Sequence, residues 1–182
     1  MDTDVKSQNV EDEMFLIDDD EASSGTSKYL LFNLGDEEYG VDIAKVTGIE
    51  ELQKITHIPD MPVFMKGVIN LRGRVIPVID LRLRFGMEER AYDDRTCIVI
   101  TDIKELSVGL IVDTVTVVMD MDASSIDPPP SFKSGSGKER YILGLARIED
   151  KVKILVDVEK IIHEDDINIL KDEMEDREKS DV

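Results

Sequence analysis

Cysteine, histidine and positive charge are all scarce in this chain of 182 residues. It has one cysteine, two histidines, and 22 lysines and arginines against 41 aspartates and glutamates, for a formal charge of -19. A single cysteine allows no internal disulfide, so we expect a reducing compartment. The negative charge would repel nucleic acid and an anionic membrane surface. No apolar run approaches the length of a membrane span and no signal sequence opens the chain, so we expect a cytosolic protein.

The few residues that could perform catalysis or bind a metal have no supporting motif around them. Cys97 lies in the apolar run TCIVIT, which predicts a buried, unreactive thiol. His57 and His163 lie far apart, and neither has the spacing of a metal-ligand pair. No nucleophile elbow or dinucleotide fingerprint occurs, and residues 135–138 lack the pattern of a phosphate-binding loop. We therefore expect no enzyme activity, no cofactor and no metal site.

The segment at residues 67–85, GVINLRGRVIPVIDLRLRF, has a weaker copy at residues 144–162. A gapless alignment pairs Gly67 with Gly144, Val75 with Val152, and Asp80 with Asp157. Each copy predicts two short strands joined by a two-residue turn, and glycine supplies the positive φ of the first turn. Upstream, the residues around Gly40 match those around Gly109. The sequence therefore predicts a tandem pair of small β-barrels or curled sheets, with a long Pro-rich loop at residues 127–139 in the second.

Short apolar segments alternate with turn residues along the rest of the chain, which predicts further strands. We expect strands over residues 29–34, 38–43, 75–81, 96–101, 106–112, 115–119, 144–148 and 152–158. Residues 46–52 are expected to be extended or mixed in conformation. Residues 63–66 are expected to form one helical turn. Because proline lacks a backbone N–H, Pro77 should lie in an edge strand or at a bulge. A final helix is expected over residues 165–176, where apolar side chains recur on one face.

Acidic residues gather at the two ends of the chain. Residues 1–27 hold nine acidic residues and one lysine, and residues 171–182 hold six acidic and three basic residues. Such composition favours solvation over packing. We therefore expect a disordered acidic tail at 1–27, a folded domain at 28–170 and a second acidic tail at 171–182.

Four arginines gather in the first copy of the repeat. Arg72 lies at the predicted hairpin tip, and Arg74, Arg82 and Arg84 follow it. An exposed guanidinium suits bidentate capture of a carboxylate, so this group could orient an acidic partner. The alternative is that these arginines only pair with the chain's own acids. The apolar residues at 61–65 have two similar interpretations, as core or as an exposed docking patch.

Two further hypotheses belong to other classes of protein. Asp80 and Asp157 could form the carboxylate pair of a metal-dependent hydrolase together with a histidine, although capping of a turn or strand end is the simpler role for each. A small-ligand sensor is also conceivable, with the ligand held between the two barrels.

Three segments of the chain together resemble the CheW family of bacterial chemotaxis coupling proteins. They are, in order, YLLFNLGDEEYGVDIAKV, PVFMKGVINLRGRVIPVIDLRLRF and VGLIVDTVTVV. The resemblance covers roughly residues 28–170. It implies two interleaved, SH3-like, five-stranded β-barrel subdomains that share a core, with a C-terminal helix. It also implies a non-enzymatic adaptor in two-component signal transduction, which couples chemoreceptor tips to the CheW-like domain of the histidine kinase CheA in membrane-associated arrays.

The resemblance also implies which residues make contacts. The receptor-binding positions would be Val46, Gly48, Arg72 and Val118. The kinase-binding positions would be Met61, Pro62, Val63 and Phe64. Gly67 and Gly73 would shape the hairpin. Relatives often carry glutamate where this chain has Gly48, with Glu50 and Glu51 shortly after, so either the charge has moved or that contact is not made.

Overall fold

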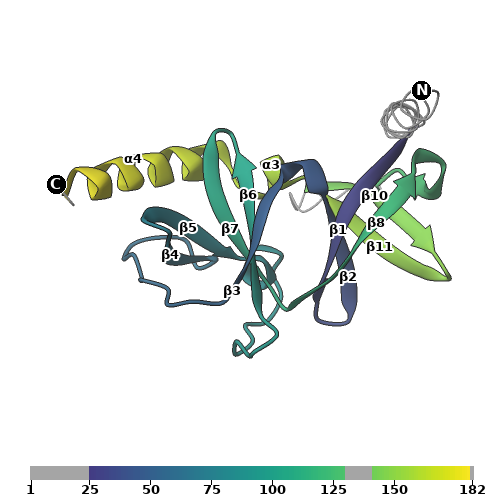
Figure 1. Ribbon diagram of the computed structural model, residues 1–182, viewed down its shortest axis with the longest axis horizontal. Coiled ribbons are helices and arrows are strands. Elements are labelled where there is room, and N and C mark those ends of the chain that lie inside the picture. Colours follow the sequence, from purple (N-terminus) through teal and green to yellow (C-terminus); the bar gives the residue numbers. More distant parts are fainter. Residues whose placement is uncertain (1–24, 130–140, 181–182) are drawn as a thin grey trace, which may run out of the picture.

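The computed structural model describes residues 25–129 and 141–180. Most of this part of the chain is β structure, in two sheets that lie side by side, with a long helix at one end (Figure 1). The elements are β1 (Thr26–Leu34), β2 (Glu37–Asp42), η1 (Ile43–Lys45), β3 (Val46–Glu51), β4 (Met65–Leu71), β5 (Arg74–Asp80), α2 (Leu81–Arg84), β6 (Cys97–Ile103), β7 (Leu106–Val112), β8 (Thr114–Asp122), η2 (Ala123–Ser125), β9 (Ile126–Asp127), β10 (Ile142–Ile148), β11 (Lys151–Val156), α3 (Val158–Ile161) and α4 (Glu164–Ser180).

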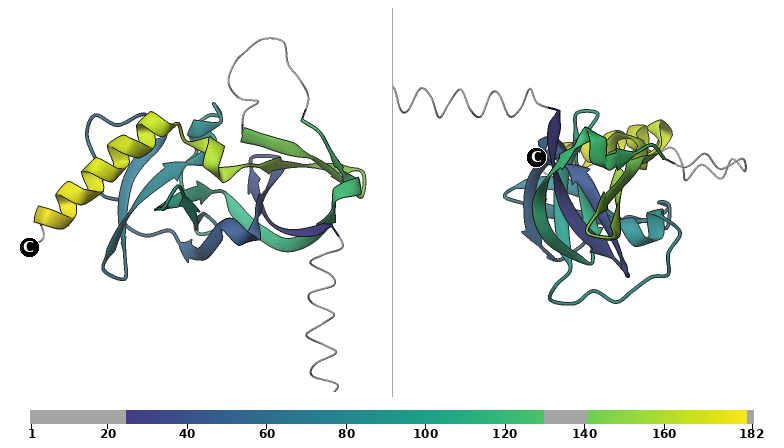
Figure 2. Two further views of the ribbon diagram at one scale, coloured as in Figure 1. Left: turned by 90° about the horizontal axis from the view of Figure 1, so that it is seen from above. Right: turned by 90° about the vertical axis from the view of Figure 1, so that its right-hand side faces the viewer.

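The two sheets are strongly curled but do not close into barrels. One has six strands in the order β8-β1-β2-β11-β10-β9, and the other has five in the order β3-β6-β7-β5-β4. The curl of the six-stranded sheet is clearest from above (Figure 2, left). The predicted mainly β fold with a C-terminal helix is therefore confirmed, and in the described residues the two predicted β units are curled sheets rather than closed barrels.

The two copies of the sequence repeat exchange strands. The five-stranded sheet takes β3, β4 and β5 from the first copy and β6 and β7 from the second, while β1 and β2 join β8 to β11 in the other sheet. Parallel pairs β2–β11 and β5–β7 connect the copies, with Gly40 opposite Leu155 and Gly109 opposite Val78. A Cβ at Gly40 would lie 2.8 Å from Leu155, and one at Gly109 would lie 2.8 Å from Val78. The repeated glycines therefore mark the two places where the copies pack closely.

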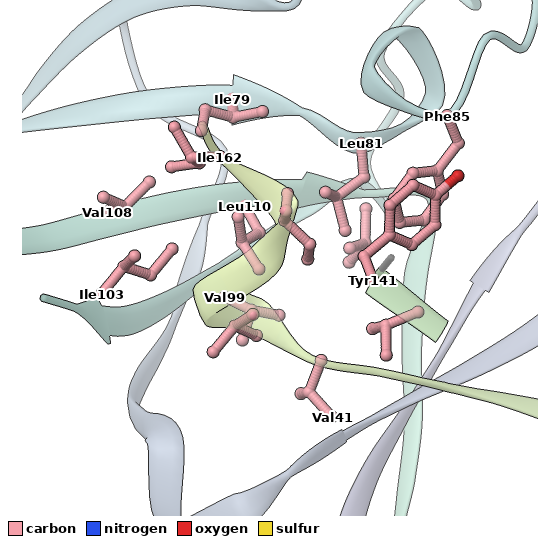
Figure 3. Packing of buried hydrophobic residues seen from close by; sticks show 14 of the residues in the cluster. Val41, Ile79, Leu81, Phe85, Val99, Ile103, Val108, Leu110, Tyr141 and Ile162 are labelled. Carbon is pink, nitrogen blue, oxygen red and sulfur yellow. The ribbon is translucent and has the colours of Figure 1, made fainter. Parts of the chain in front are cut away.

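A single main core fills the space between the sheets. Its side chains come from both sheets and from the α3 region, including Val41 of β2, Ile79 of β5, Val99 of β6, Leu110 of β7, and Ile162 (Figure 3). All five are at most 2% exposed. Burial of such side chains is the main source of stability, so the two sheets depend on each other for it.

The expected helical turn at residues 63–66 is wrong. Val63 and Phe64 form a tight turn closed by the Met65 N–H, which donates to the Pro62 carbonyl at 2.9 Å. Strand β4 then begins at Met65, which is buried opposite Ile79 of β5. Pairing of Met65 with β5 thus outweighs the tendency of residues 63–66 to form a helical turn.

Pro77 occupies an interior strand, contrary to the expected edge position. Its partner in β4 is Val68, and the N–H and carbonyl of Val68 both point away from β5, toward Thr56, at 2.9 and 2.8 Å. In an antiparallel ladder both residues of such a pair direct their N–H positions away from the other strand. The N–H position of Pro77 therefore faces β7 and not β4. On that side β5 pairs with β7 only from Val78 onward. The missing N–H of proline therefore removes no ladder hydrogen bond.

Helix α4 is longer than its sequence pattern predicted. It runs to Ser180 and so includes residues 171–180, which were expected in an acidic tail. Ile167, Leu170 and Met174 are all at most 8% exposed and hold the helix against the sheets. The other predicted tail lies mostly outside the described residues, as does most of the predicted Pro-rich loop. None of the described helices is long and apolar enough to cross a membrane.

Gly67 permits the closest backbone approach beside β4. The chain after β3 crosses to the outer edge of β4, where Thr56 and Val68 exchange two hydrogen bonds. Gly67 has φ 141°, and a Cβ there would lie 2.0 Å from the Thr56 carbonyl oxygen. Only glycine satisfies both the backbone angle and the contact.

We expect Gly67→Ala to lower the free energy of unfolding by about 3–5 kcal/mol, because backbone strain and overpacking add. Gly73→Ala is the matched control, since Gly73 also has positive φ but no atom of the described residues within 4 Å of a Cβ. This variant should lose only about 1–2 kcal/mol. Urea denaturation of both variants measures the difference. Equal losses would show that the Thr56 approach contributes nothing.

Candidate functional site

The turn between β4 and β5 presents one guanidinium to solvent. Arg72 and Gly73 have φ 53° and 86°, the pattern of a type I′ hairpin turn. The Gly73 N–H donates to the Asn70 side-chain oxygen at 2.9 Å, which supports the turn. The side chain of Arg72 is 84% exposed. A well-ordered backbone therefore carries a side chain that a partner can reach.

A carboxylate from the opposite edge of the sheet lies beside Arg72. The Nη2 atom of Arg72 is 3.7 Å from Oε1 of Glu50, which belongs to β3. Gly48 lies two residues before Glu50 and so on the same face of the strand. A Cβ at Gly48 would lie 3.9 Å from Oε1 of Glu50. The Glu50 carboxylate thus lies beside both Gly48 and Arg72, and that it takes over the partner contact expected at position 48 stays a prediction.

The two predicted receptor-binding valines lie in edge strands of different sheets. Val46 begins β3 and packs partly against the main core, while Val118 lies in β8 and is 46% exposed. Sequence reasoning missed two similar apolar side chains on these strands, Ile49 at 47% and Val117 at 48% exposure. The repeat could have identified Ile49, because it aligns with Val118 at the same offset that aligns Gly40 with Gly109.

The loop at residues 61–64, predicted to contact a kinase, has both buried and exposed members. Phe64 packs against the main core and lies beneath the Arg84 guanidinium, whose Cζ is 5.6 Å from the ring centre. Met61 is also partly buried against the core. Val63 is 79% exposed. Of these side chains, Val63 is the most accessible to a partner.

Three of the four clustered arginines have hydrogen-bond partners within the protein. Arg82 makes a bidentate pair with Asp113, with Nε–Oδ1 and Nη2–Oδ2 distances of 2.7 and 2.6 Å. Arg84 donates to the Ile161 carbonyl and stacks over aromatic rings. Arg74 donates to the Ser107 hydroxyl at 3.3 Å. Pairing with the chain's own acids is therefore the correct interpretation for Arg82, while Arg84 is held by a carbonyl and by aromatic rings. Arg72 and Arg74 are both exposed, and Arg72 lies at the tip of the turn.

Asp113 joins three segments that are distant in sequence. It accepts hydrogen bonds from Arg82 after β5, from the Gly35 N–H between β1 and β2 at 2.8 Å, and from Arg90 at 3.3 Å. Burial by itself would raise the pKa of Asp113, but hydrogen bonds from Arg82 and Gly35 and the nearby positive charges lower it below 3.8. The ionised carboxylate therefore stabilises the fold.

Asp80 and Asp157 cap short helices, as their simpler role predicted. Asp80 accepts from the Leu83 N–H at 3.3 Å and from the Tyr92 hydroxyl at 2.7 Å. Asp157 accepts from the Glu159 N–H at 3.0 Å. Within residues 25–129 and 141–180, no group of three or more His, Cys, Asp and Glu side chains could hold a metal ion. The metal-dependent hydrolase thus has no supporting geometry in this part of the chain.

Two remaining expectations concern the burial of Cys97 and a ligand site between the two sheets. Cys97 is only partly buried, and its Sγ lies 3.2 Å from the Arg95 carbonyl, so the predicted full burial is wrong. The reason is its place at the start of β6, opposite the last residue of edge strand β3. The junction of the two sheets is filled by the main core, which counts against a small-ligand site there.

Comparison with known proteins gives one consistent family. Residues 28–166 match the model of the CheW-like domain. The chain is 38% identical over 143 residues to the chemotaxis protein CheW of Klebsiella aerogenes, covering 79% of this chain and 86% of that protein. The probable chemotaxis protein CheW of Rhizobium etli is 32% identical over 142 residues, with coverages of 78% and 91%. The crystal structure of the scaffolding protein TtCheW from Thermoanaerobacter tengcongensis has a TM-score of 0.68 at 38% identity, covering 74% of this chain and 91% of that one.

We expect Asp113→Asn to lower the free energy of unfolding at neutral pH by about 3 kcal/mol, because it leaves Arg82 partly buried without its ionic partner. In the wild type, the contribution of Asp113 is present above the unfolded pKa near 3.8 and is lost as the pH falls through the lower folded value. The unfolding free energy of the variant should therefore depend less on pH in this acidic range.

Denaturation midpoints measured across this acidic range test the expectation for Asp113. Asp94→Asn is the control, because it makes the same chemical change at an exposed position. Parallel pH curves for the wild type and Asp113→Asn would contradict the assigned role.

Proposed function

The chain belongs to the family of CheW-like domains, and on that basis we propose that it is a non-enzymatic chemotaxis adaptor. It couples the cytoplasmic tips of chemoreceptors to the histidine kinase CheA. It acts in the cytoplasm, where receptors and kinase recruit it to membrane-associated arrays, and it needs neither cofactor nor metal. The proposal is supported by relatives named as chemotaxis proteins and by a similar structure named as a scaffolding protein.

Arg72 is the observation that carries the proposal. A scaffold that binds a partner needs a side chain held ready by a rigid backbone and still open to solvent. Arg72 meets both conditions, since its backbone lies in a hydrogen-bonded turn and its side chain is 84% exposed. The guanidinium would receive a carboxylate of the receptor tip. The exposed Val118 would add apolar contact from the other sheet.

Val63 supports a second contact, with the kinase. It is 79% exposed in a loop whose neighbours Met61 and Phe64 pack against the core. An exposed apolar side chain on a well-anchored loop suits docking against an apolar partner surface. The receptor and the kinase would then use different residues and could be bound at the same time, as coupling requires.

Arg72→Glu should weaken capture of a chemoreceptor tip fragment by about ten-fold or more, because it replaces attraction of a carboxylate by repulsion. Its melting temperature should stay within about 2 °C of the wild type, since the side chain is exposed. Lys151→Glu is the matched control, because Lys151 follows the equivalent turn of the other hairpin and undergoes the same charge change. Equal binding by the folded Arg72→Glu variant and the wild type would remove the main support for the proposal.

Val63→Asp should weaken binding of the CheA regulatory domain by about ten-fold while receptor capture stays unchanged. Fluorescence anisotropy with each labelled partner measures both affinities on one protein preparation. If both affinities fall together, the loop does not provide a separate kinase contact.

A further inference from the structure

We infer that Glu50 competes with the partner's carboxylate for the guanidinium of Arg72, and that this competition modulates the affinity of the site. The inference rests on the proposed function, because it concerns the same arginine. It goes further in naming the residue of this chain that opposes binding.

The contact between Arg72 and Glu50 is loose. It joins one nitrogen and one oxygen at 3.7 Å, which is longer than a hydrogen bond. The pair of Arg82 and Asp113 shows the alternative in the same protein, with two bonds of 2.7 and 2.6 Å and both side chains 13% exposed. An incoming carboxylate could make the bidentate contact with Arg72 that Glu50 does not make.

Glu50 is held beside the site by its strand, whereas the side chain of Arg72 is open to solvent and to a partner. The side chain of Glu50 is 24% exposed against 84% for Arg72. Its backbone is held in β3 by pairing with Ile98 of β6. Gly48 leaves the space above its own Cα to the Glu50 carboxylate, whose Oε1 would lie 3.9 Å from a Cβ there. Glu50 is thus part of the sheet surface, and a partner reaches Arg72 beside it.

Competition follows from the charges. A partner carboxylate must replace Glu50 at the guanidinium and then lie close to a second negative charge. Solvent screens an exposed pair of this kind, so the effect is modest. Removing the charge of Glu50 should therefore tighten binding by about two- to five-fold, which corresponds to an internal pair that occupies about half to four fifths of the Arg72 population.

The test measures capture of a chemoreceptor tip fragment by the full-length chain and by Glu50→Gln, which keeps the size and removes the charge. Glu51→Gln is the matched control, because it makes the same change one residue away, on the opposite face of β3. We expect tighter binding by Glu50→Gln, no comparable gain for Glu51→Gln, and a smaller difference at high salt. In the Arg72→Gln background, Glu50→Gln should give a smaller gain, because Glu50 then no longer competes for the guanidinium and only its repulsion of the partner carboxylate is removed.

Each outcome decides between the two proposals. Capture by the wild type with no gain for Glu50→Gln, or an equal gain for Glu51→Gln, would overturn the inference and leave the adaptor function intact. Weaker capture by Glu50→Gln would also overturn it, since Glu50 would then position Arg72 for its partner. No capture by the wild type would overturn the adaptor proposal and the inference with it.

Discussion

The parallel pairing of β5 with β7 and of β2 with β11 is the interaction on which the rest of the structure depends. Each pair joins a strand of one sequence copy to a strand of the other, at a glycine that lets the neighbouring side chain approach closely. Both sheets are therefore composed of the two copies, and one core of buried side chains serves them. A substitution in the core beneath one sheet will also disturb the packing of the other, because the two sheets share the same packed interior.

The curl of the five-stranded sheet and the hydrogen bonds at its edge position the surface residues of the site. Strands β3 and β4 form opposite edges of one curled sheet, and the curl brings Glu50 of β3 next to Arg72 at the end of β4. Thr56 adds two hydrogen bonds to the outer edge of β4, across the close approach at Gly67. The Arg72 turn is thus supported from several directions while its side chain points into solvent. Rigid support with an open side chain is what a binding site on a scaffold needs.

Arginines of one short segment acquire different roles in the folded protein. Arg82 completes a carboxylate network that ties α2 to the β1–β2 turn, and Arg84 bonds to the α3 region and covers Phe64. Arg72 has a long contact with Glu50. Burial makes the first two interactions structural, while exposure leaves the third available to a partner. Arg72 thus presents an exposed positive charge at this turn of an otherwise acidic chain.

Local sequence patterns determined the strands, the turns and the duplication, because each depends on residues close together in the chain. Positive φ at the Arg72–Gly73 turn and helix capping by Asp80 follow from such short-range preferences. The exchange of strands, the interior place of Pro77 and the position of Glu50 beside Arg72 depended on the tertiary structure. They arise from pairing between distant segments, and the periodicity of a strand states which faces are apolar but does not state which strand lies beside it.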